Sequence, residues 1–281
     1  MPTSVGYRHG DYPVGVSTNL STWTFITRAQ TFEVTRVYPA TQVQELGNIK
    51  PVGVVTDVNQ FRGRIVAYMI QNNIVAGSIE ASFGGTNAIA WSSGSTHIAG
   101  PIEGLKFARL TNVEYTARVG GFATATYTVE GTDVSGAQTV TATTPATGTP
   151  AYRTPNIAVS VGASGSVLRA QAVTVRINLR ANRLEELNNA NVVGYAFDSP
   201  EVRADVDWVE STALTGFNTG TVAVPIDLVI NIGGVRTLTC YSMVTTDKTY
   251  RGTVGGWATR RMSFFAMGNE SAGNYGGFAI S

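Results

Sequence analysis

The chain has 281 residues, enough for one large domain or two modest ones, each with a buried core. Charged residues make up 14% of it, against about 25% in an ordinary soluble protein. The 20 basic and 19 acidic residues nearly cancel, which excludes a strongly basic nucleic-acid binder and a disordered acidic chain. The shortage of charge indicates a surface that is largely covered by other protein molecules.

The sequence offers no signal for a membrane or for secretion. No apolar run approaches the roughly 18 residues that a membrane helix needs, and the first 20 residues do not resemble a signal peptide. We therefore expect a soluble, unprocessed protein without a membrane partner. One cysteine, Cys240, cannot form an internal disulfide, and in a predicted strand it is expected to be a small apolar filler.

Short runs of β-branched and aromatic residues, separated by glycines and other turn residues, predict a mainly β chain. Residues 1–24 form a predicted N-terminal arm. The predicted strands are 29–38, 62–70, 106–118, 121–129, 167–179, 202–208, 222–230, 237–244 and 257–267. Two short helices are expected at 41–48 and 181–189, where Leu, Glu, Gln and Ala gather. Residues 136–165 are expected to be an extended connector or a further edge hairpin, and 268–281 a C-terminal arm; both arms are expected to need a partner for order.

Alternation is clearest at 202–208, where every second residue is apolar. A period of two places Arg203, Asp205 and Asp207 together on the opposite face of this strand. The pattern predicts a half-buried strand with one charged face.

The chain also repeats itself. Arg28-Ala29-Gln30 recurs as Arg169-Ala170-Gln171, and at this offset of 141 residues 12 of the 35 positions in 28–62 are identical. Background usage would give about two or three identities. A second block, 119–124, recurs at 254–259 with an offset of 135, and each copy contains a Gly-Gly pair suited to a tight hairpin turn. These repeats predict two copies of one β domain.

Motifs for catalysis are missing from the sequence. The two histidines, His9 and His97, lack metal-ligand spacing, and neither a nucleophile elbow nor a phosphate-binding loop is present. Asp205 and Asp207 could act as a glycosidase acid pair, but the first copy has an arginine and a valine at the matching positions. We expect a non-enzyme without metal or cofactor, and an enzyme ranks last among the alternatives.

Each copy carries a strand, a predicted helix with Glu-Leu followed by Gly or Asn, and a strand pair that opens at Val-Gly. These motifs are Glu45-Leu46-Gly47 and Glu186-Leu187-Asn188. The pattern resembles the tail tube proteins of long-tailed bacteriophages over residues 28–130 and 169–267. The resemblance implies two tandem tube domains, 25–135 and 166–267, each a β-sandwich or half-barrel with one short helix. Six such domains close a ring-shaped β-barrel in that family, so two per chain imply a trimeric ring.

The resemblance also implies a function. Stacked rings would form a hollow conduit that carries double-stranded DNA and a tape-measure protein during genome delivery, in the tail of a virion assembled in the host cytoplasm. The other implied partners are further copies of the chain, tail terminator and baseplate or tip proteins, and a sheath where the tail has one. The implied lumen residues are Arg62, Arg64, Arg203, Asp205 and Asp207. The implied ring-stacking contacts are Asn87, Trp91 and His97.

Two other functions fit the same sequence. One is a hub or adaptor that carries tandem tube domains but forms a single ring at one end of a tail. The other is a two-domain β-sandwich binding module, such as a capsid decoration protein or an adhesin, which would remain a monomer or a small oligomer. The sequence leaves open whether the tail contracts.

Overall fold

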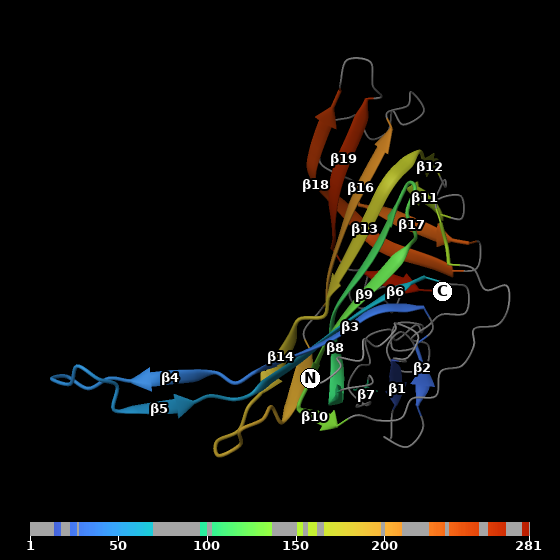
Figure 1. Ribbon diagram of the computed structural model, residues 1–281. Helices are drawn as coiled ribbons and strands as arrows, with labels where there is room; N and C mark the ends of the chain where they lie inside the picture. The colour runs from blue at the N-terminus through green and yellow to red at the C-terminus, as the bar shows by residue number, and fades with distance from the viewer. Residues whose placement is uncertain are drawn as a thin grey trace, which may run out of the picture.

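A computed structural model gives the fold of the chain (Figure 1). The structure describes β-strands and the segments that connect them. They are 14–17, 23–26, 28–69, 96–99, 103–136, 151–153, 157–161, 166–197, 200–209, 225–233, 236–252, 258–267 and 277–280. The prediction of a mainly β chain is confirmed. In this part of the chain there is no helix, and so none that could cross a membrane.

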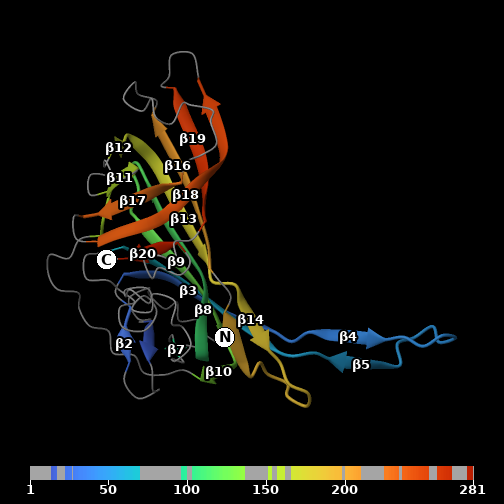
Figure 2. The same cartoon turned by 180° about the vertical axis from the view of Figure 1, so that it is seen from behind.

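The main layer is a twisted antiparallel sheet that runs through both halves of the chain (Figures 1 and 2). Its strands, in spatial order, are β3 (Ala29–Val37), β6 (Gln60–Tyr68), β9 (Thr124–Gly131), β8 (Glu103–Arg118), β13 (Ala170–Asn178), β16 (Glu201–Val209), β19 (Thr259–Ala266) and β18 (Arg236–Arg251). The two halves meet where β8 pairs with β13. Within the described residues the sheet does not close into a barrel.

A second layer packs across the first because the long strands β8 and β18 take part in both. The first part of β18 pairs with β17 (Ile226–Ile232) and β20 (Phe278–Ile280), and β17 continues to β11 (Ile157–Val161) and β12 (Ser166–Leu168). The first part of β8 pairs with β7 (Thr96–Ala99) and β10 (Asp133–Gly136), and β7 continues to β1 (Gly15–Ser17) and β2 (Thr24–Phe25). Phe107 and Ser242, with φ of 52° and 49°, lie where the partners of each long strand change.

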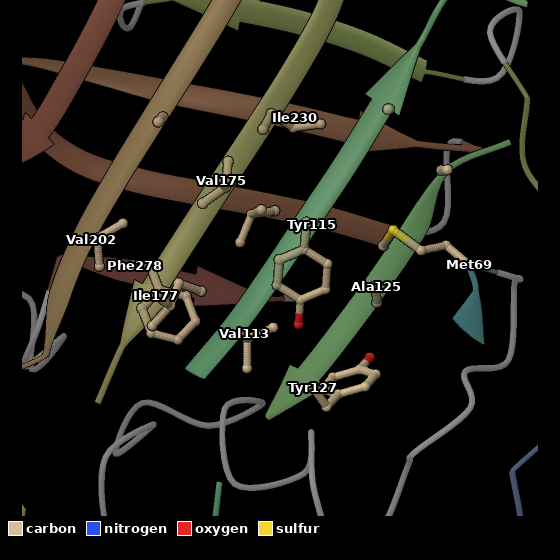
Figure 3. Close-up of a cluster of buried hydrophobic side chains, with 14 of the residues drawn as sticks. Met69, Val113, Tyr115, Ala125, Tyr127, Val175, Ile177, Val202, Ile230 and Phe278 are labelled. Atoms are coloured by element: carbon tan, nitrogen blue, oxygen red, sulfur yellow. The ribbon is translucent and has the colours of Figure 1, made fainter. Parts of the chain in front are cut away.

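The core lies between these layers and follows from the period-two alternation of the strands. Val113, Tyr115, Val175 and Ile177 point from the main layer toward Ile230 and Phe278 of the strands that cross it (Figure 3). Trp208 is also buried, as the sequence predicts. The opposite face of the same strands carries the charged residues, so one face of the main layer is packed and the other is polar.

Both predicted helices are wrong, because the segments form β-hairpins. Residues 41–48 lie in a hairpin of β4 (Ala40–Val43) and β5 (Gly53–Thr56), and 181–189 in a hairpin of β14 (Ala181–Leu184) and β15 (Gly194–Phe197). Gly47 and Asn188 take φ of 92° and 66° at the tips, a conformation that ends a helix. Each segment also has too few residues for a helix to be stable without packing, whereas pairing satisfies its backbone groups.

The described parts of both predicted arms form strands of the sheet. Val16 in β1 is buried and pairs with Ile98, and Phe278 in β20 is buried and pairs with Cys240. Part of the predicted connector, β11, forms an edge hairpin with β12. Gly120 has a φ of 82° in the turn between β8 and β9, as the Gly-Gly motif predicts, while the second Gly-Gly pair lies outside the described residues.

Candidate functional site: a charged sheet face and two open edges

The described residues bring together no group of three or more His, Cys, Asp and Glu side chains that could hold a metal ion. Cys240 is fully buried in β18 among apolar residues. Burial, with a smaller contribution from Asp227, raises the pKa of its thiol to about 12, so the reactive thiolate is scarce at neutral pH. The features that remain are the polar face of the main layer and its strand edges.

The five residues predicted to line a lumen all lie on this polar face. Arg62 and Arg64 lie on β6, and Arg203, Asp205 and Asp207 lie on β16. The structure does not bring the two groups together, since β9, β8 and β13 separate β6 from β16. They are members of one wide charged surface rather than of one compact cluster.

At its centre the charges form a connected network. Arg176 on β13 lies 2.8 Å from Glu114 on β8 and 2.8 Å from Asp205 on β16. Asp205 also accepts a hydrogen bond from the Ser263 hydroxyl at 2.6 Å and lies 3.6 Å from the Arg261 guanidinium. Burial alone would raise the pKa of Asp205, but the bonds from Ser263 and Arg176 and the nearby Arg261 outweigh it, so the pKa is lowered.

Glu130, at the end of β9, is the centre of a second cluster. It lies 3.0 Å from Arg62 on the neighbouring strand and 3.1 Å from Arg183 of the second hairpin, residues 181–197. Tyr195 of that hairpin donates a hydrogen bond to the Gly131 carbonyl oxygen at 3.1 Å, and burial followed by the charge of Glu130 raises its pKa. The second hairpin is thus bound to the first half of the chain through polar groups.

A further ion pair joins Arg180 to Glu201 at 2.8 Å, and Arg203 also contacts Glu201. Hydrogen bonds from these two arginines lower the pKa of Glu201 and keep it charged at neutral pH. Most guanidinium groups of this network therefore lie beside a carboxylate, and Glu130, Asp205 and Glu201 are each shared by two arginines.

The two strand edges of the main layer differ from its interior. At the joint between the halves, β8 is paired on both sides, with β9 and with β13. Among the described residues, β3 is paired only with β6, and the end of β18 is paired only with β19. Unpaired edges of this length attract further strands. Tyr250 on the β18 edge is 61% exposed.

The three residues predicted to contact a neighbouring ring stay a prediction. Asn87 and Trp91 lie outside the described residues. His97 lies in β7 and pairs with Ser17 through the backbone. Sequence reasoning missed Glu114, Arg176 and Arg183. Alternation on 112–118 and 172–178 could have placed the first two on a polar face, but their pairing depends on the adjacency of β8 and β13.

Comparisons of the chain with protein-family models and with curated protein sequences found no match.

Proposed function

We propose that the chain is a structural, non-catalytic subunit of a bacteriophage tail tube, in which three chains form a ring and rings stack into a hollow conduit. The observation that carries this proposal is the joint between β8 and β13, together with the two open edges that would form the same joint between chains.

We infer that the two halves are copies of one domain. Adding 141 to the pairs of β3 with β6, and of β4 with β5, gives the pairs of β13 with β16 and of β14 with β15. Adding 135 to the pairs of β8 with β9 gives those of β18 with β19, including the bulge. Thr111 donates to the Thr128 carbonyl at 3.2 Å at this bulge, and Thr246 donates to the Ser263 carbonyl at 3.2 Å.

Applying the same offsets to the internal joint predicts a corresponding joint between two chains. In the internal joint Tyr115 of β8 faces Val175 of β13. The counterparts are Tyr250 of one chain and Val34 of the next, and Arg251 would then face Glu33, a favourable cross-strand pair. Tyr115 is 4% exposed and Tyr250 is 61% exposed, as expected if Tyr250 becomes buried only on assembly.

Such a joint is head-to-tail, and head-to-tail contacts build a closed ring or an open filament. The resemblance to tube domains, six of which close a ring, favours closure with three chains. Each chain adds eight strands to the main layer, so three chains give 3 × 8 = 24 strands. Closure removes both open edges, which is how β-barrels avoid unwanted strand pairing.

The polar face supports the choice of cargo. The second layer covers the apolar face of the main layer, so the polar face is the one left to line a channel (Figures 1 and 2). Arg62, Arg176 and Arg203 there are paired with carboxylates, which weakens their attraction to the phosphates of a nucleic acid. Double-stranded DNA and an extended tape-measure protein could slide along such a wall. Terminator and baseplate or tip proteins would close the ends of the tube.

Electron microscopy of the purified chain, in negative stain with two-dimensional averaging, tests this function. We expect hollow tubes of stacked rings with three subunits in each ring. Isolated single rings would assign the chain to a tail hub or adaptor. Compact monomers that persist at high concentration would refute the tube and favour a β-sandwich binding module.

A further inference from the structure

The first hairpin, residues 40–56, projects away from the body of the molecule (Figures 1 and 2). Its apolar side chains are exposed: Ile49 at 101%, Val54 at 62% and Val55 at 59%. The second hairpin, residues 181–197, instead binds the end of β9 in the first half of the same chain. Two hairpins of the same register thus differ in whether they have a binding site within the chain.

Four polar groups hold the second hairpin in place, two on the hairpin and two at the end of β9. Arg183 and Tyr195 belong to the hairpin, and they bind Glu130 and the Gly131 carbonyl oxygen. Arg109 lies opposite Glu130 in the sheet. Burial lowers the pKa of Arg109, and the nearby Tyr195 opposes this shift. Between the hairpin tip and β15, Asn191 forms a β-bridge with Asn59. The Asn59 side chain also donates a hydrogen bond to the Asn191 side chain at 3.1 Å.

The offsets of 141 and 135 give the counterpart of each of these residues. In the hairpin, Arg183 corresponds to Gln42 and Tyr195 to Val54. In the binding site, Glu130 corresponds to Phe265 and Arg109 to Val244, while Gly131 corresponds to Ala266. The charged and hydroxyl-bearing residues are thus replaced on both sides by neutral or apolar ones.

This matched change indicates that the two counterparts meet. A carboxylate without its arginine would be costly at a buried contact, and so would a lone arginine. Replacing the charged residue only on the hairpin, or only in its binding site, would leave such an unpaired charge. In the counterparts, both residues are replaced. The arginine on the neighbouring strand also contacts the replaced residue in each half. Arg62 pairs with Glu130, and its counterpart Arg203 lies 5.8 Å from the centre of the Phe265 ring.

We propose that the first hairpin binds a second copy of this chain, at the end of β19, with Val54 packed on Phe265 and Ala266 of the neighbouring subunit. The inference rests on the proposed ring. Within the chain, the joint of β8 with β13 brings the second hairpin against the half that contains β8 and β9. The same arrangement between chains brings the first hairpin to the half that contains β18 and β19. It predicts that Lys50 lies beside Pro200 of the neighbour, as Asn191 lies beside Asn59.

A charge introduced on one side and balanced on the other tests this contact. Phe265→Glu places a carboxylate opposite the apolar hairpin and should raise the concentration needed for ring formation by about tenfold or more. Adding Gln42→Arg recreates the pair that Glu130 and Arg183 form, and should restore most of the loss. Failure of this second change to restore assembly would overturn the proposed contact, provided that both variants unfold at the temperature of the unchanged chain.

Disulfide trapping in the full-length chain separates this inference from the ring itself. Glu33→Cys with Arg251→Cys reports the joint, and Lys50→Cys with Pro200→Cys reports the hairpin contact; buried Cys240 does not compete. Lys50→Cys with Asn59→Cys is the matched control, because the second hairpin already occupies Asn59. We expect covalent trimers from the first two pairs and none from the control. Trapping at the joint without trapping at the hairpin would overturn the inference alone, and trapping at neither, without rings in the micrographs, would refute the proposed function too.

Discussion

Tyr250→Ala should weaken ring assembly while leaving the folded monomer intact. Tyr250 is 61% exposed, whereas its counterpart Tyr115 at the internal joint is 4% exposed, so assembly would bury a further 57% of the residue (61 − 4). For a tyrosine that buries about 200 Å² in full, this is about 110 Å², or about 3 kcal/mol at about 25 cal/mol per Å². The expected effect is a loss of about a hundredfold in affinity at each joint.

Sedimentation velocity over a range of concentrations measures this shift, and thermal unfolding of dilute protein measures the stability of the monomer. Phe107→Ala is the matched control, because Phe107 is 45% exposed but lies in the part of β8 between β7 and β10. It should leave ring closure unchanged. Tyr115→Ala should instead destabilise the monomer by about 3 kcal/mol or more.

Two results would refute the reasoning about the joint. One is Tyr250→Ala rings that form at the same concentration as those of the unchanged chain. The other is a monomer destabilised by Tyr250→Ala as strongly as by Tyr115→Ala, which would mean that Tyr250 belongs to the core of its own chain.

Three further predictions concern stability and reactivity. Gly63→Ala should lower the free energy of unfolding by about 1–3 kcal/mol in urea, because the added Cβ would lie 2.8 Å from two buried side chains, and a value unchanged from the parent would contradict this. The lowered pKa of Asp205 should stabilise the fold above its unfolded pKa of about 4, and this contribution is lost as pH falls through the lower folded pKa, so urea unfolding of Asp205→Asn and the parent should converge in acid. Cys240 should resist a thiol reagent at pH 8 until the chain is unfolded, since its pKa is about 12, and fast labelling of the native protein would contradict its burial.

Much of the main layer could be predicted from the sequence because alternation is a local signal. The strand at 202–208 matches β16, and Trp208 is buried as expected. The charged face of β16 follows from the same period of two. The hairpins could not be identified in this way, since a Leu- and Glu-containing segment of eight residues favours a helix by composition and becomes β only through its partner strand. Val54 and Val55 of β5 were the missing signal, because β-branched residues favour strands.

The site was less predictable because its pairs join residues far apart in the chain. Arg176 and Glu114 are separated by 62 positions, and Arg183 and Glu130 by 53. Alternation predicts which face each residue occupies, but only the adjacency of β8 and β13 determines which charges meet. The duplication proposed from the sequence becomes informative once these internal contacts are known, because it assigns a counterpart to each of them.

The two proposed contacts between chains depend on each other energetically. At the internal joint Val113 faces Ile177, whereas the counterparts Lys248 and Arg36 carry like charges, which disfavour direct pairing. Positive charge on exposed edges also protects a monomer from indiscriminate strand pairing. The proposed joint between chains would therefore be weaker than the internal one, and the apolar contact proposed for the first hairpin would supply the stabilisation that the edge lacks. On this proposal a subunit would assemble only where a neighbour offers both the edge and the binding site for the hairpin.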